Sequence, residues 1–319
     1  MSDIKLFSLA SGKATELVGN ASDLEKPLQT LIEKNLEVLL GIRFLDTEYQ
    51  TGKTHAGRID TLGLDENNCP VIIEYKRSLG ENVINQGLFY LDWLMDHQAE
   101  FKLRTMEVLG KSAADNIDWS APRLICIAAD FTKYDAHAVQ QINRNVELIR
   151  YRRFGKELLL FELANAVAAT GSKGSKKKVL APQSKGKSVG LKAGSGDKSV
   201  TEWMETLAKP QLELLASIEE YILSLGDDVQ RKELKLYVAY KRLRNFATIV
   251  PQKSQFLLYL HVNPDEIKLI PKIGKDVRNI GHWGTGDLML TISNSLNLEL
   301  AKPLILRAYQ GKSAPAELG

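Results

Sequence analysis

Apolar residues follow a helical period in three parts of the first half of the chain. One pattern predicts a helix from about 22 to 41, because its apolar positions recur every three or four residues and a glycine ends the run. Similar spacing predicts a long helix over about 81–108 and a shorter helix over about 134–143. The residues that define the first pattern are Leu28, Leu31, Ile32, Leu36 and Leu39, followed by Gly41.

Strand patterns fill the intervals between these helices. Residues 42–50, 57–64 and 70–76 are predicted strands, and the polar run 65–68 between the last two is typical of a hairpin turn. Residues 124–129 are continuously apolar, which indicates a strand buried on both faces, and two more strands are predicted at 146–153 and 157–163. The order α-β-β-β-α-β-α-β-β predicts a mixed sheet flanked by helices, in the α/β or α+β class.

The composition changes sharply after this region. Residues 171–198 are rich in Gly, Ser and Lys, and the part from 172 to 198 holds eight lysines and one aspartate, in a chain whose net charge is only +3. Such a segment buries too little apolar surface to offset the entropy of ordering, so we expect a disordered linker at 169–199 between domains at 1–168 and 200–319. The linker is either a solubilising tether or a contact to a nucleic-acid backbone that reads no sequence.

The second domain is predicted to be a smaller α+β unit. A helix is expected over 200–225 and another over about 297–309, with strands at 237–240, 246–250, 255–262 and 287–293. The segment 240–246 reads Tyr-Lys-Arg-Leu-Arg-Asn-Phe, which is basic with aromatic ends. We expect this domain to recognise nucleic acid or a protein partner.

Composition and cysteine usage narrow the class of protein. The chain is 44% hydrophobic and 25% charged, as in globular proteins, and it contains no apolar run of membrane-spanning length. The N-terminus has no signal-peptide pattern, and Cys69 and Cys126 have no histidines at metal-ligand spacing. These features predict a cytoplasmic protein without a disulfide or a membrane contact.

The candidate chemistry lies in two neighbouring predicted strands. Asp60 lies within the strand at 57–64, and Glu74 and Lys76 belong to the strand at 70–76. Residues i and i+2 of a strand share a face, so Glu74 and Lys76 are expected to point the same way. Two carboxylates and an ammonium group suit a hard divalent cation and an activated water. The alternative is a Glu74–Lys76 pair on a solvated strand face, with Asp60 as a turn residue.

This arrangement resembles the PD-(D/E)XK nuclease superfamily, in which an Asp precedes a Glu-x-Lys on the next strand. Gln86-Gly87-Leu88-Phe89-Tyr90 is similar to the Gln-x-x-x-Tyr element of RecB-like nucleases. Glu25-Lys26-Pro27-Leu28-Gln29, Gly57-Arg58-Ile59-Asp60 and the Glu-x-Lys-Arg ending at Arg77 resemble the catalytic domain of NucS-type endonucleases. The resemblance covers roughly residues 22–110 and implies a restriction-endonuclease-like fold. It does not extend to the DNA-binding domain that precedes the catalytic domain in NucS-type enzymes.

The resemblance assigns roles to individual residues. Asp60 and Glu74 are expected to hold Mg²⁺ or Mn²⁺, with Glu25 as a third ligand and Glu33 in reserve. Lys76 would orient or help deprotonate the attacking water, and Gln86 would position the water or the phosphate. The expected phosphate or nucleic-acid contacts are Arg58, Arg77, Lys53 and Tyr90, although Tyr90 is equally well explained as a core aromatic.

The sequence thus predicts a metal-dependent endonuclease with a C-terminal accessory domain, with DNA favoured over RNA as substrate. Two nicks in a duplex would suit a homodimer, and the second domain is a candidate contact for a protein partner. The competing interpretation is a non-catalytic nucleic-acid-binding or protein-interaction module on a nuclease-like scaffold.

Overall fold

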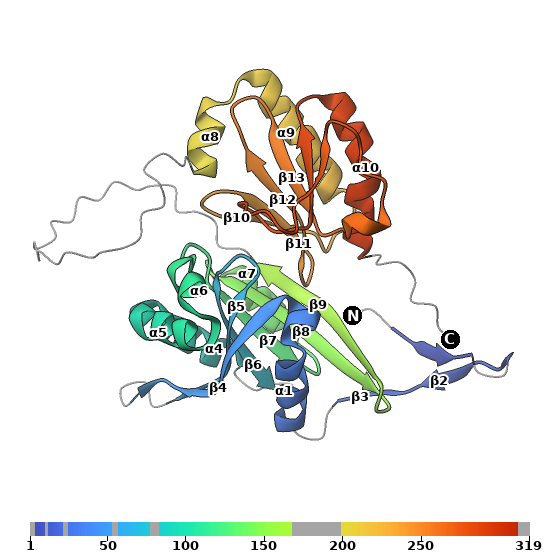
Figure 1. The fold of residues 1–319 in the computed structure, drawn as a ribbon. Coiled ribbons are helices and arrows are strands. Elements are labelled where there is room, and N and C mark those ends of the chain that lie inside the picture. The colour runs from blue at the N-terminus through green and yellow to red at the C-terminus, as the bar shows by residue number, and fades with distance from the viewer. Residues whose placement is uncertain are drawn as a thin grey trace, which may run out of the picture.

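A computed structural model describes residues 4–9, 12–21, 25–52, 57–76, 83–167 and 199–311. It is an α+β protein with two sheet-containing domains, one above the other in Figure 1. The first domain contains a seven-stranded mixed sheet with helices on its faces, and the second contains a six-stranded antiparallel sheet. Within the described residues, no helix combines the length and apolar character needed to cross a membrane.

The sheet of the first domain has the order β3-β8-β7-β6-β5-β4, with β9 paired to β8. Strands β6, β7 and β8 run parallel to one another, and the other pairs are antiparallel. A separate two-stranded ribbon, β1 and β2, precedes it near the N-terminus. The strands are β1 (Leu6–Ser8), β2 (Thr15–Leu17), β3 (Gly19–Asn20), β4 (Ile42–Gln50), β5 (Arg58–Asp65), β6 (Pro70–Lys76), β7 (Arg123–Ala128), β8 (Asn145–Phe154) and β9 (Leu158–Val167).

Helices cover this sheet on both faces, and alternate residues of its strands supply the two cores. Residues such as Ile73 and Ile125 pack with α1 (Glu25–Lys34) and α2 (Leu36–Leu40). Their neighbours Ile72 and Cys126 face the opposite core, to which α4 (Val83–Asp96) contributes. The remaining helices of the domain are α5 (Gln98–Leu109), α6 (Lys111–Asp115) and α7 (Lys133–Gln140).

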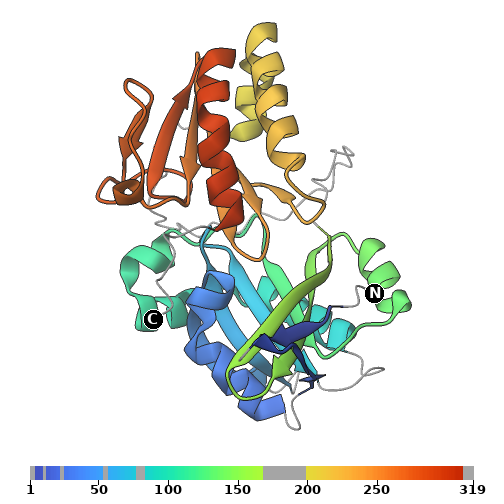
Figure 2. The ribbon, with the colours of Figure 1, turned by 90° about the vertical axis from the view of Figure 1, so that its right-hand side faces the viewer.

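The second domain is a sheet of order β10-β11-β12-β13-β15-β14 packed against helices. Helices α9 and α10 lie side by side against this sheet (Figure 2). The elements are α8 (Val200–Thr206), α9 (Lys209–Leu223), β10 (Gln230–Glu233), β11 (Val238–Lys241), β12 (Asn245–Pro251), β13 (Phe256–Leu260), the short 3-10 helix η2 (Pro264–Glu266), β14 (Gly274–Asp276), β15 (Leu288–Ile292) and α10 (Ser295–Gln310).

The fold class is as predicted, and several element boundaries differ. The long helix expected at 81–108 is two helices, because the chain breaks at His97 between α4 and α5. The helix expected at 200–225 is likewise divided, because Leu207 and Ala208 have extended backbone between α8 and α9. Strands β1, β2, β3, β10 and β14 were not predicted, since each has at most four residues and little apolar pattern. Residues 168–198 of the predicted linker lie outside the described residues.

Candidate active site

The structure brings the carboxylates of Asp60 and Glu74 together. Strands β5 and β6 pair antiparallel up to the rung Thr61–Ile73, and Asp60 and Glu74 are the next residues beyond that rung. The backbone N–H of Asp60 donates to Glu74 Oε1 at 3.2 Å, and the backbone N–H of Tyr75 donates to Asp60 Oδ2 at 2.9 Å. Each strand therefore holds the acidic side chain of the other through a backbone donor.

The pair lies at the carboxyl end of a parallel strand. Glu74 is in register with Cys126 of β7, and Lys76, two residues further along β6, is in register with Ala128. In sheets with parallel strands, ligands bind preferentially beyond the carboxyl ends of the strands. A substrate can thus bind at the end of the sheet that carries Asp60, Glu74 and Lys76.

Burial makes this pair electrostatically costly. The Glu74 side chain has no solvent exposure, and its Oε2 has no hydrogen-bond partner among the residues that the structure describes. Burial, and then the charge of Asp60, raise the pKa of Glu74 to about 9, although Lys76 partly offsets the effect. Burial also raises the pKa of Asp60, against the opposing effects of the Tyr75 N–H and Lys76.

These properties fit a divalent cation. An ionised carboxylate in this position is costly unless a cation or donor compensates it, and no described residue donates to the second oxygen of Glu74. Mg²⁺ is commonly held by one or two carboxylates and keeps several waters, which suits a two-carboxylate site. Within the described parts of the chain, no group of three or more His, Cys, Asp and Glu side chains is arranged to hold a metal. If an ion binds here, Asp60 and Glu74 are the carboxylates that would hold it.

The two glutamates considered as a third ligand occupy different environments. Glu25 lies in the first turn of α1, and its negative charge contributes to the raised pKa of Asp60. Glu33 instead accepts a hydrogen bond from Thr61 Oγ1 at 2.6 Å and one from Gln29 Nε2 at 3.0 Å. Thr61 also contacts Tyr75, which belongs to the core beneath α1 and α2, so Glu33 is directed away from Glu74.

Gln29 is a supporting residue that the sequence reasoning missed. Its side chain is only 3% exposed, and its Nε2 donates to the backbone oxygen of Asp60 at 2.7 Å. The same amide reaches Thr47 Oγ1 on β4 at 3.2 Å. Gln29 thus fixes α1 against the strand that carries Asp60. A signal for this role was present in the sequence: a glutamine lies within the apolar stripe of a helix. A polar side chain buried there needs a hydrogen-bond partner.

Glu48 is a second residue near the pair that the sequence reasoning did not single out. Its charge contributes to the raised pKa of both Asp60 and Glu74. Its carboxylate is held by Lys26 Nζ at 2.8 Å and Arg58 Nη1 at 3.4 Å. Glu48 has a φ of 52°, a left-handed conformation that non-glycine residues seldom adopt.

The Gln-x-x-x-Tyr element supports the start of β5. The Tyr90 hydroxyl accepts from Gln86 Nε2 at 3.3 Å and from the Arg58 backbone N–H at 3.2 Å. Tyr90 is only 6% exposed within the core, which fits the core-aromatic alternative, and its nucleic-acid contact stays a prediction. The described contact of Gln86 is with Tyr90 and not with Asp60 or Glu74.

The predicted basic contacts are only partly described. The guanidinium of Arg58 is largely exposed beside Glu48, where a phosphate can reach it. Lys53 and Arg77 lie outside the described residues.

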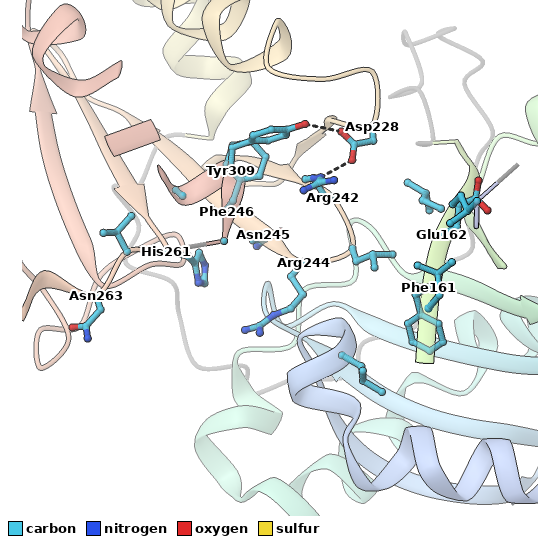
Figure 3. A pocket seen from close by; sticks show the side chains of 18 residues that line it. Phe161, Glu162, Asp228, Arg242, Arg244, Asn245, Phe246, His261, Asn263 and Tyr309 are labelled. Atoms are coloured by element: carbon cyan, nitrogen blue, oxygen red, sulfur yellow. Dashed lines mark hydrogen bonds and ion pairs between the residues drawn. The ribbon is translucent and has the colours of Figure 1, made fainter. Parts of the chain in front are cut away.

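A separate pocket of about 660 Å³ opens between the two domains (Figure 3). It is lined by apolar residues of β9, including Phe161, and by polar residues of the second domain, including Arg242 and His261. Arg242 is paired with Asp228, and Glu162 is paired with Arg150, so these charges are compensated inside the chain. None of the predicted site residues lines this pocket.

Comparison with known proteins adds relatives without an assigned activity. Residues 201–312 match the family described as a domain of unknown function, DUF5655. The chain is also similar to a Haemophilus influenzae protein described as uncharacterized, with 29% identity over 322 residues, covering 96% of this chain and all of that protein. That similarity extends across both domains. No solved structure matches.

Proposed function

We propose that this protein is a metal-dependent nuclease that hydrolyses phosphodiester bonds, with DNA favoured over RNA. The observation that carries the proposal is the Asp60–Glu74 pair, in which Glu74 is buried, its second carboxylate oxygen has no donor among the described residues, and Lys76 lies at the same strand end. The resemblance of these residues, and of the helix at Gln86 to Tyr90, to PD-(D/E)XK nucleases supports the same activity.

Each residue of the site has a definite task in this proposal. Asp60 and Glu74 would hold Mg²⁺ or Mn²⁺ through their oxygens, and Glu74 must release its proton to do so. When bound, the ion supplies a water of lowered pKa and offsets charge on the scissile phosphate. The Lys76 ammonium orients that water or donates to a phosphate oxygen, and Arg58 contacts the phosphate backbone. Gln29 and Tyr90 keep β5 in place.

A cleavage assay with single- and double-stranded DNA and RNA, in Mg²⁺ or Mn²⁺, tests this activity. Asp60→Asn, Glu74→Gln and Lys76→Met should each lower cleavage at least roughly a hundredfold while circular dichroism remains native. Glu157→Gln is a suitable control, because Glu157 is exposed in the turn before β9. Near-wild-type cleavage by the Glu74→Gln protein would refute the proposal.

The competing function is a non-catalytic nucleic-acid-binding or protein-interaction module. The absence of a three-residue metal group among the described residues is the observation that favours it. Thermal unfolding with and without Mn²⁺ separates the two, because a native state that binds the ion melts at a higher temperature. Stabilisation of the wild type by Mn²⁺, lost in Asp60→Asn, supports a metal site. Nucleic-acid binding with neither stabilisation by Mn²⁺ nor cleavage supports the non-catalytic module.

We propose a cytoplasmic location for this activity. Cys69 and Cys126 are both buried and unpaired, as is usual in a reducing compartment.

A further inference from the structure

The second domain covers the end of the first sheet that lies opposite the candidate site. Asp65 is the last residue of β5, Arg123 is the first residue of β7, and Glu147 is near the start of β8. All three side chains are buried. Asp60 and Glu74 are at the other ends of their strands, so the second domain leaves that end of the sheet uncovered.

The buried charges of the first domain are not balanced by that domain alone. Arg123 Nη1 lies 2.9 Å from Asp65 Oδ2, and the same guanidinium contacts both oxygens of Glu147, at 2.8 and 3.0 Å. One guanidinium therefore contacts two buried carboxylates. A buried carboxylate without sufficient compensation is strongly destabilising.

Two lysines of the second domain supply the missing charge. Lys241, at the end of β11, is 3% exposed, and its Nζ lies 3.0 and 3.1 Å from the two oxygens of Glu147. Lys232 of β10 is also buried, with its Nζ 3.5 Å from Asp65 Oδ2 and 3.2 Å from the Ala121 carbonyl oxygen.

The titration of the carboxylates agrees with this arrangement. Burial alone would raise the pKa of Asp65, but Lys232 and Arg123 lower it to about 2. Arg123 and Lys241 similarly overcome burial to lower the pKa of Glu147 to about 2. Both carboxylates are thus ionised at neutral pH, and part of their compensation comes from the other domain.

Neutral contacts extend the same interface. Leu243, in the turn between β11 and β12, packs against the first-domain core beneath α1 and α2. Asn245 Nδ2 donates to Asn67 Oδ1 at 2.7 Å, and the Tyr237 hydroxyl donates to the same oxygen at 3.1 Å. Asn67 belongs to the β5–β6 turn, so the second domain holds the turn that joins the strands carrying Asp60 and Glu74.

We propose that the second domain is a docking domain for the first. Its docking surface consists of β10, β11 and the following turn to Asn245, and it binds the acidic end of the first sheet, including the β5–β6 turn. The docked surface is required for the native stability of that hairpin. This role is independent of whether the first domain cleaves nucleic acid. It also assigns a task to residues 230–245, which lie within the DUF5655 match.

The test uses the full-length chain with Lys232→Met and Lys241→Met together. The double variant removes both second-domain cations that contact Asp65 and Glu147, so we expect the melting temperature to fall by roughly 5 °C or more. Hydrogen exchange should accelerate at least tenfold in residues 58–76, while α10 keeps its protection because it lies outside the docking surface. The matched control is Lys209→Met with Lys253→Met, because both lysines are exposed.

The outcomes separate docking from general destabilisation. A melting temperature and exchange pattern equal to those of the control would overturn the proposal. If the double variant does not fold, the Lys241→Met single variant carries the test, because Arg123 and Lys232 still balance Asp65 and Glu147. Faster exchange confined to residues 58–76 and the docking surface then supports docking, and uniform acceleration through the whole chain contradicts it.

Discussion

At the scale of single residues, Glu74 has the most unusual environment in the candidate site. Its neighbours on β6 are apolar and fully buried, so the strand carries the carboxyl group into the core. One oxygen accepts the Asp60 N–H, and the other has no hydrogen-bond partner within the described part of the chain. The side chain is therefore costly for folding in its ionised form, as expected of a residue kept for binding or catalysis.

Replacing Glu74 by glutamine should stabilise the metal-free protein at alkaline pH. The folded-state pKa of about 9 exceeds the ordinary value of 4.5, so the folded protein binds this proton more tightly than the unfolded chain does. This contribution is fully favourable below about pH 4.5 and is lost as the pH rises towards 9, at up to about 1.4 kcal/mol per pH unit. Glutamine does not titrate, so urea unfolding at pH 5.5 and pH 8 in chelator should show a smaller loss of stability in the variant.

The exposed Glu157→Gln variant controls for the loss of a negative charge. It should retain the pH dependence of the wild type. An identical slope of unfolding free energy against pH in Glu74→Gln and wild type would show that Glu74 is ionised at little cost in the fold.

The sequence was sufficient to predict the central pair, but not its support. Asp60 and Glu74 could be found because strand periodicity and an apolar context make an acidic residue conspicuous. Gln29 and Glu48 could not, because their importance depends on α1 and β4 lying beside β5 in space. The roles expected of Glu25, Gln86 and Lys76 came from the resemblance and stay predictions.

At the scale of elements, the site depends on how closely α4 approaches the sheet. A Cβ added at Gly87 would lie 2.4 Å from Leu124 Cδ1 on β7 and 3.1 Å from its Cγ. Leu124 is fully buried, so it has little room to move. Gly87 therefore allows α4 to place Gln86 and Tyr90 against the start of β5.

Gly87→Ala should destabilise the protein although alanine is the better helix former. The gain in helix propensity is at most about 1 kcal/mol, whereas overpacking a buried contact costs about 1–3 kcal/mol. We expect a net loss of about 1–2 kcal/mol in chemical denaturation. Gly281→Ala is the control, because its added Cβ meets nothing within 4 Å and should leave stability nearly unchanged. Equal stability of the two variants would mean that Leu124 repacks without cost.

Element boundaries were harder to predict than element types. Periodicity found the strands β4 to β9 of the first domain, because each carries a long apolar pattern. It joined α4 to α5 across His97, since the apolar spacing continues through the break. Tertiary packing determines where such helix breaks occur, and the helix propensity of the local sequence does not reveal it.

At the scale of the whole molecule, the two domains are joined by contacts that the sequence did not reveal. A lysine-rich segment between two apolar regions predicts separate units, and the basic segment 240–246 resembles an exposed patch. In the structure, Lys241 and Leu243 of that segment are turned into the first domain. Glu147, the partner of Lys241, is 94 residues away in the chain, a pairing that no local pattern encodes.

Leu243→Ala tests the apolar part of this interface without changing its charges. The side chain is partly buried against the core of the first domain, so truncation should cost about 2 kcal/mol, the low end of the range of about 2–5 kcal/mol for leucine. If the domains unfold together, calorimetry should show a single transition displaced downward by a few degrees, because the lost contact contributes to the stability of both domains. Leu296→Ala, at a residue that is 69% exposed near the start of α10, should melt like the wild type. Two outcomes would contradict this expectation: a Leu243→Ala protein that melts at the same temperature as this control, or two transitions of which only one is displaced. Either would show that the domains are stable independently and that the contact of Leu243 with the first domain contributes little stability.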